Sequence, residues 1–232
     1  MMSKRGDLSS PVLQMGRLAS RSLEQGARMA VQQLPNTLVS AVWPARADLG
    51  GRGLASGLRM ALLAIVGTAL LTASAKLNVP FYPVPMTMQT LVVLMLGAAY
   101  GWRLATATVV LYLVEGALGL PVFAGTPALG IGLPYMMGPT GGFLAGFVAG
   151  AALVGWLCER GLGRSFAGMA LAMLLGHVAI FAFGYGWLAT IAGPQVAWTA
   201  GVAPFFLATV LKTALGAALV PALWTLADRR QG

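Results

Sequence analysis

Residues 84–120 read VPMTMQTLVVLMLGAAY, then GWR, then LATATVVLYLVEGALGL, and this stretch decides the class of fold. Each of its two apolar runs is close to the roughly 20 residues that a helix needs to cross a bilayer. Arg103 and Glu115 are its only charged residues. Because only Gly101-Trp102-Arg103 separates the two runs, we expect them to form a tight antiparallel pair of helices.

Further apolar runs of similar length lie on both sides of this pair. An ordinary soluble domain has about 25% charged residues, whereas this chain of 232 residues has 9% charged and 58% hydrophobic residues. Composition and run length therefore predict an all-α membrane protein with six transmembrane helices. The predicted spans are Leu58–Ala75, Val84–Tyr100, Leu104–Leu120, Gly141–Cys158, Phe166–Ala189 and Val202–Leu226.

The positions of the basic residues predict the orientation of the spans. With the N-terminus in the cytoplasm, all fifteen Lys and Arg residues except Lys76 and Lys212 fall toward the inside. This bias places both termini in the cytoplasm, which requires an even number of spans. The net charge of +9 then faces anionic lipid headgroups. No basic patch interleaved with aromatic residues is present, so we expect no nucleic-acid partner.

The first 56 residues differ in character from the rest. They are basic, contain several prolines and have no apolar run long enough to cross a bilayer. We predict a cytoplasmic extension at residues 1–56 and a transmembrane domain at residues 57–228. Two states stay open for the extension, a disordered tail or a weak amphipathic helix on the membrane surface. A secretory signal peptide is excluded because no continuous apolar segment follows the basic residues.

Two connections on the outer side contain more proline and apolar residues than a simple link between helices requires. Residues 76–85 contain three prolines around two aromatic residues, and proline there predicts a stiff extended segment without helix or sheet. The stretch Leu120–Thr140 has four prolines and almost no charge. Its apolar side chains favour a loop that folds back as a lid or pocket wall, although an interfacial loop anchored by aromatic residues stays open.

Ionisable residues inside the spans are the sharper indication of function. Each costs roughly 2.5–3.5 kcal/mol at mid-bilayer on insertion scales. Glu115 and Lys212 both lie toward the outer ends of their spans. Three interpretations are open: they form an ion pair with each other, they line an outward-facing pocket for a small anionic or amphoteric molecule, or they do both and the pair opens when the ligand binds. His177, the only histidine, has no carboxylate at helical spacing and is interpreted as structural.

Catalytic apparatus is missing from the sequence. One cysteine, Cys158, and one histidine exclude an intrachain disulfide and a cysteine metal cluster. Since no phosphate-binding loop of the Walker type occurs, we expect no enzyme activity, no cofactor and no metal. Energy for transport must come from another polypeptide or from a gradient. A stand-alone secondary transporter for a small vitamin-like solute stays open as the alternative.

Three motifs carry a resemblance to a known family. VPFYPVPMTMQTLVVLMLGAAYG at 79–101, LYLVEGALGLPVFAGTP at 111–127 and MMGPTGGFLAGFVAG at 136–150 resemble the BioY family. Its members are the biotin-binding S components of energy-coupling-factor (ECF) transporters. The resemblance implies a six-helix, multi-pass subunit of the bacterial inner membrane that binds biotin near the outer face. It further implies a transmembrane coupling protein and ATP-binding cassette ATPase subunits as partners.

The resemblance also implies which residues bind the ligand and contact the coupling protein. At one of these positions the sequence differs from the family pattern. Near the last helix the family pattern has Pro-Phe, then an acid and, three residues after the acid, a lysine. Here Pro204-Phe205 and Lys212 are present, and Thr209 stands in the place of the acid. Small residues at Ala69 and Ala73 of the first span are expected to contact the coupling protein. The predicted ligand-binding residues are Lys212, Thr209, Glu115, Tyr135, Phe123, Gly125 and Phe143. Lys212 or Lys76 is expected to meet the biotin carboxylate.

Overall fold

A computed structural model describes residues 37–42, 54–79 and 86–229, which belong to one compact unit. Five of its helical stretches are long and apolar enough to cross a membrane, which confirms the predicted all-α membrane class. The helices are α2 (Leu38–Val42), α3 (Leu54–Lys76), α4 (Gln89–Ala117), α5 (Gly132–Met136), α6 (Gly141–Glu159), α7 (Phe166–Ala192), α8 (Pro194–Gly201) and α9 (Phe206–Arg229), with the 3-10 turns η1 (Leu162–Arg164) and η2 (Ala203–Phe205).

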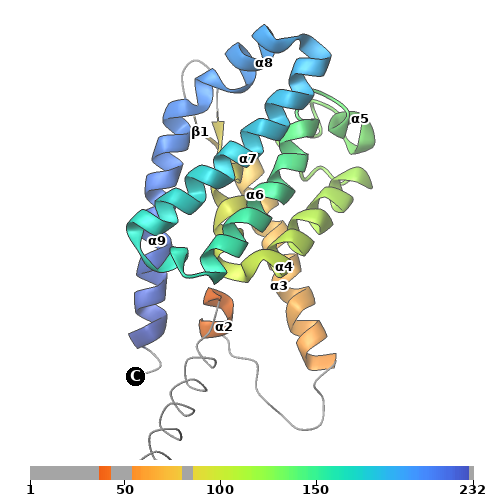
Figure 1. The fold of residues 1–232 in the computed structure, drawn as a ribbon. Helices are drawn as coiled ribbons and strands as arrows, with labels where there is room; N and C mark the ends of the chain where they lie inside the picture. Colours follow the sequence, from red (N-terminus) through yellow and green to blue (C-terminus); the bar gives the residue numbers. More distant parts are fainter. Residues whose placement is uncertain (1–36, 43–53, 80–85, 230–232) are drawn as a thin grey trace, which may run out of the picture. The chain divides into compact units, whose positions relative to one another are not determined.

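The helix α4 is a hairpin of two limbs. Gly101 has φ 78° and ψ 168°, values that interrupt the helix at the predicted turn. The Gln89 side chain lies 2.8 Å from the Tyr112 hydroxyl, although a straight helix would separate these residues by roughly 35 Å at 1.5 Å per residue. The predicted antiparallel pair is therefore present, and Figure 1 shows its two limbs diverging from the bend. By length and composition the whole of α4 is one of the five stretches that could cross a membrane. Whether its two limbs cross separately, as six passes require, stays a prediction.

The bend needs a glycine because its φ of 78° is one that other residues rarely adopt. A Cβ atom on Gly101 would lie 2.3 Å from the Glu159 Oε1 atom. The same carboxylate oxygen accepts a hydrogen bond of 3.1 Å from the Trp102 backbone N–H. The end of α6 thus holds the bend of α4.

The connection before α4 corrects two predictions. Asn78–Val79 (β1) and Met86–Thr87 (β2) pair as antiparallel strands, with Asn78 opposite Thr87. The expectation of no sheet was wrong because the three prolines lie between the paired residues, which keep their own N–H groups. The second predicted span also begins too early, since the helix starts at Gln89.

The entrance to the last helix is also more complex than a single span. Instead of one helix from Val202, the structure has α8, the turn η2 and then α9 from Phe206. Pro204 lies within η2. Proline has no N–H to donate and suits the first turn of a helix rather than its interior, which explains why α9 begins after it.

Glycines on the inner faces bring α4, α6 and α7 close together. A Cβ atom on Gly97 of α4 would lie 2.7 Å from the Ala151 carbonyl oxygen, and one on Gly146 of α6 would lie 2.8 Å from that of Ile180. Helices in lipid associate through such close packing because lipid leaves no hydrophobic force between them. α6 is consequently the centre of the bundle.

The two ends of the bundle differ in their elements. Figure 1 shows the bend of α4, the α6–α7 connection and the last turns of α9 at one end, and β1, α5 and α8 at the other. The first end holds the cation–π contact of Arg164 over Trp224, at 4.2 Å, and the bonded pair Trp102 and Glu159. We call it the basic end, after Arg103, Arg160, Arg164 and Arg229.

A small part of the predicted extension is described. α2 packs against α4 and α9, and its Leu38 and Ala41 are buried. Residues 1–36 and 43–53 lie outside the described residues, so the disordered and membrane-surface alternatives and the boundary at residue 56 stay predictions.

Candidate ligand-binding site

A cavity of about 540 Å³ lies at the end of the bundle opposite the basic end. Its walls come from β2, the starts of α4, α6 and α9, the second half of α7, α8, η2 and the α4–α6 connection. The lining residues are Met86, Thr87, Gln89, Thr90, Ala124, Tyr135, Pro139, Thr140, Phe143, Leu144, Phe147, Ile180, Phe181, Leu188, Ala192, Val196, Ala200, Gly201, Phe205, Ala208, Thr209 and Lys212. A mostly apolar lining with a few polar groups is the usual composition of a small-molecule site.

Lys212 is the only cationic residue among those lining residues. It lies in the second turn of α9, and only 7% of its surface is exposed. Its ammonium donates to the Thr87 carbonyl oxygen at 2.7 Å and to the Thr90 hydroxyl at 2.9 Å. Because an ammonium group has three N–H donors, one donor remains for an oxygen of a ligand.

Thr209 lies one turn before Lys212 on the same face of α9 and also lines the cavity. Within the described part of the chain its half-buried hydroxyl has no hydrogen-bond partner. A hydroxyl can donate one hydrogen bond and accept others. The structure therefore brings Thr209 and Lys212 together with both able to bind a ligand.

Aromatic side chains form one wall of the cavity. Phe143 and Phe181 meet edge to face with ring centres 6.4 Å apart, and Phe181 lies 6.5 Å from Phe205. Phe143 was predicted for the site and lines it, whereas Phe181 and Phe205 were missed. Phe205 follows Pro204 in the motif before Lys212, which was an available signal. Phe181 lies in an unbroken apolar run, where nothing distinguished it from its neighbours.

Tyr135 connects the α4–α6 loop to the cavity. It is on α5 and lines the cavity, and its hydroxyl donates to the Ala124 carbonyl oxygen at 2.8 Å. Burial raises the pKa of Tyr135, so the hydroxyl keeps the proton that it donates. The loop Leu120–Thr140 therefore forms part of the pocket wall, as the first of the two sequence interpretations expected.

Phe123 and Gly125 do not line the cavity. The Phe123 ring is 1% exposed and lies between two tyrosines, edge to face with Tyr112 at 5.3 Å and stacked on Tyr135 at 5.2 Å. Gly125 has φ 73°, and its carbonyl oxygen accepts a hydrogen bond of 3.0 Å from the Leu129 N–H. In this structure Phe123 anchors the loop and does not face the cavity, and ligand binding by Phe123 and Gly125 stays a prediction.

Glu115 also lies outside the lining residues. It is half-buried on the second limb of α4. Among the described residues no ion pair joins it to Lys212, whose ammonium donates to Thr87 and Thr90 instead. The proposed Glu115–Lys212 pair is therefore wrong for this structure, because tertiary packing gives the lysine neutral oxygen partners.

Lys76 holds the α4–α6 loop rather than facing the cavity. Its ammonium donates to the Phe123 carbonyl oxygen at 2.9 Å and to the carbonyl and hydroxyl oxygens of Thr126 at 2.7 and 2.8 Å. These bonds use its three donors. Of the two lysines predicted to meet a carboxylate, only Lys212 has a donor to spare.

His177 lies in the interior between α7 and α9. It is 1% exposed, its Nδ1 atom lies 2.9 Å from the Met173 carbonyl oxygen, and it does not line the cavity. Its Nε2 atom has no partner within the described residues. This position agrees with a structural role, which stays a prediction.

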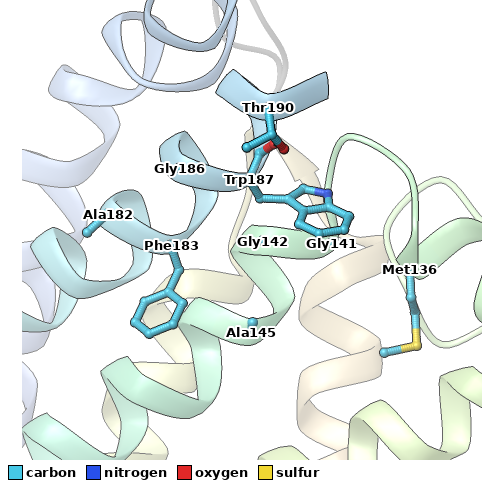
Figure 2. Close-up of a pocket in the computed structure, with 9 residues that line it drawn as sticks. All are labelled: Met136, Gly141, Gly142, Ala145, Ala182, Phe183, Gly186, Trp187 and Thr190. Carbon is cyan, nitrogen blue, oxygen red and sulfur yellow. The ribbon is translucent and has the colours of Figure 1, made fainter. Parts of the chain in front are cut away.

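A second hollow lies on the outer face of α6 and α7. This groove has a volume of about 610 Å³ and is lined by Met136, Gly141, Gly142, Ala145, Ala182, Phe183, Gly186, Trp187 and Thr190. Figure 2 shows Trp187 and Phe183 of α7 beside the two glycines that begin α6. The Thr190 hydroxyl and the Trp187 indole N–H already have carbonyl partners. The groove thus offers little polar chemistry to a ligand.

The predicted contact residues of the first span lie on the surface. Ala69 and Ala73 of α3 are both exposed. Leu62, Ile65 and Val66 of the same helix are 47%, 59% and 45% exposed. In the described chain α3 thus has an apolar face that no other described element covers.

Fold and cavity together define a multi-pass α-helical membrane protein with a candidate ligand cavity at one end. A sequence profile of the BioY family matches residues 45–229. The chain belongs to the BioY family, and the predicted resemblance is confirmed.

Relatives and a solved structure agree with this assignment. The probable biotin transporter BioY of Pyrococcus horikoshii is 33% identical over 164 residues, 71% of this chain and 91% of that protein. The biotin transporter BioY of Rhizobium etli is 39% identical over 124 residues, 50% of this chain and 65% of that protein. The S-component for biotin from an ECF-type ABC transporter aligns with a TM-score of 0.62 and 22% identity, over 76% of this chain and 94% of that one. The fold is therefore shared with that S-component.

Proposed function

We propose that this protein is the biotin-binding S component of an ECF-type importer. The observation that carries the proposal is the cavity in which Lys212 and Thr209 meet the wall of Phe143, Phe181 and Phe205. Membership of the BioY family supports biotin as the ligand.

The chemistry of the cavity suits biotin. Biotin combines an apolar bicyclic body with a ureido group and a carboxylate tail. The aromatic wall matches the apolar body, and the spare N–H of Lys212 matches an oxygen acceptor. A volume of about 540 Å³ lies within the range of roughly 300–1,000 Å³ that is usual for small-ligand pockets.

The proposed orientation puts the cavity on the outer side of the bacterial inner membrane, with both termini in the cytoplasm. The basic end, with Arg103, Arg160, Arg164 and Arg229, then lies inside, in accordance with the positive-inside rule. Biotin captured in the cavity would be delivered inward when the chain is coupled to a transmembrane coupling protein and ATPase subunits. Labelling of a cysteine introduced beside Arg164 with an impermeant reagent in intact cells tests this, and efficient labelling from outside would reverse the orientation.

Partner proteins are part of the proposal. The exposed face of α3, with Ala69 and Ala73, would contact a transmembrane coupling protein, and separate ATPase subunits would supply the energy. Purification of the tagged chain from cells that express these subunits tests the assembly. Ala69→Leu together with Ala73→Leu should weaken co-purification at least severalfold. Sustained biotin uptake by the chain in cells without any such ATPase would instead support a stand-alone transporter.

Biotin binding by the purified protein in detergent is the direct test. Isothermal titration should give saturable binding of biotin at one site, with no binding of lipoate or thiamine as controls. A preparation that is folded by thermal unfolding yet shows no saturable biotin binding would exclude the proposed function.

A further inference from the structure

A short chain of buried hydrogen bonds ends at the cavity. The Gln89 Nε2 atom donates to the Tyr112 hydroxyl at 2.8 Å, and that hydroxyl donates to the Val122 carbonyl oxygen at 2.9 Å. Gln89 is 4% exposed and Tyr112 is fully buried. The bonds join the two limbs of α4 to the loop that forms the cavity wall.

This arrangement decides which way the Gln89 amide faces. A tyrosine hydroxyl has one proton, and Tyr112 uses it on the Val122 carbonyl oxygen. Toward Gln89 the hydroxyl can therefore only accept, so the amide must turn its NH₂ group to Tyr112. A flipped amide would set two acceptors against each other, and buried polar groups without partners are costly.

The carbonyl oxygen of this amide consequently points to the other side. Gln89 lines the cavity beside Thr90, which binds Lys212. Its Oε1 atom has no hydrogen-bond partner among residues 37–42, 54–79 and 86–229, and it is not among their fully enclosed unpartnered atoms. An acceptor oxygen is thus accessible from the cavity, at the end where Lys212 lies.

We propose that Tyr112 is a positioning residue that makes Gln89 a selective acceptor for an N–H group of the ligand. The inference rests on the proposed function. Biotin has N–H donors only in its ureido group, because its carboxylate is ionised and offers none. Gln89 therefore recognises one ureido N–H and supplies the acceptor that Thr209, in place of an acid, offers only weakly.

Packing keeps Tyr112 in place. Phe123 lies edge to face with its ring at 5.3 Å, and the same phenylalanine stacks on Tyr135 at 5.2 Å. The aromatic residues that anchor the loop therefore also hold the hydroxyl that orients Gln89.

Binding of biotin and of its two analogues methylated on a single ureido nitrogen tests the inference in three variants. Gln89→Met removes the acceptor at similar volume, and Tyr112→Phe removes only the orienting hydroxyl. Tyr100→Phe is the matched control, since the Tyr100 hydroxyl donates to the Leu63 carbonyl oxygen at 3.0 Å away from the cavity. Thermal unfolding of each variant in detergent monitors the fold.

Biotin affinity should fall about tenfold in Gln89→Met and about fivefold in Tyr112→Phe, with little change in Tyr100→Phe. Both cavity variants should also lose the preference for biotin over one methylated analogue, which a purely structural defect would leave intact. Wild-type affinity in Gln89→Met, or equal losses for biotin and both analogues, would overturn the inference while the proposed function stands. If Tyr112→Phe does not fold, Gln89→Met decides. Failure of the wild type to bind biotin would contradict both the proposed function and this inference.

Discussion

The two hollows of this protein are similar in volume but differ in chemistry. The groove on α6 and α7 measures about 610 Å³ and the cavity beside α4 and α9 about 540 Å³. No charged residue lines the groove, and its polar side chains bond to nearby carbonyl groups. The cavity instead contains a buried lysine with a donor to spare and a threonine without a described partner.

This difference shows that size does not identify a ligand site in a membrane protein. An apolar groove on the outside of the helices meets acyl chains, which are as apolar as leucine. A buried ammonium inside a span is expensive and is therefore retained where it has a task. Converging polar groups with unused hydrogen-bonding capacity, rather than volume, distinguish the candidate site.

The largest effect is expected from removing the cation. Lys212→Met should lower biotin affinity on the order of 100-fold, since a hydrogen bond to a charged group contributes about 1.5–3 kcal/mol. Titration calorimetry measures the loss. Lys76→Met is the matched control and should change affinity far less, because the Lys76 ammonium already bonds to Phe123 and Thr126. Equal losses in both variants would contradict the assignment of Lys212 as the available lysine.

A smaller effect is expected from the hydroxyl of the cavity. Thr209→Val should reduce biotin affinity about two- to tenfold, the usual contribution of a neutral hydrogen bond. The same substitution in the groove, Thr190→Val, should leave affinity unchanged, because the Thr190 hydroxyl bonds to the Trp187 carbonyl oxygen. Competition binding with labelled biotin compares the two, and unchanged affinity in Thr209→Val would remove Thr209 from the site.

The smallest effect is expected from filling the groove. A Cβ atom on Gly186 would meet no atom within 4 Å, so Gly186→Leu is a suitable substitution to fill the groove. Biotin affinity should stay within about twofold of wild type, because the groove residues lie on the opposite face of α6 and α7 from the residues that line the cavity. A large loss, with the thermal unfolding midpoint unchanged, would show that the groove communicates with ligand binding.

Much of the fold could be predicted because it depends on local sequence. The apolar runs predicted the long helices, and the start of α7 at Phe166 agrees with its predicted span. The three-residue separation around Gly101 predicted the α4 hairpin. The predicted helix boundaries were wrong where proline or strand pairing determines the local structure. Met86–Thr87 pairs as a strand, and η2 contains Pro204.

The candidate site was less predictable, for a physical reason. Lys212, Thr209, Tyr135 and Phe143 were named from sequence and line the cavity. Gln89 was missed because its importance depends on a hydroxyl 23 positions away. Nothing in the local sequence distinguishes a glutamine with an oriented amide from one that only begins a helix.

By itself the sequence determined the membrane class, the α4 hairpin and the BioY family, because these depend on apolar run length, chain spacing and motif order. Only the tertiary structure decided between the two outer lysines. Lys76 meets Thr126, 50 positions away, and Lys212 meets Thr87, 125 positions away. The number of N–H donors that each ammonium keeps for a ligand follows from these distant contacts, which no local pattern encodes.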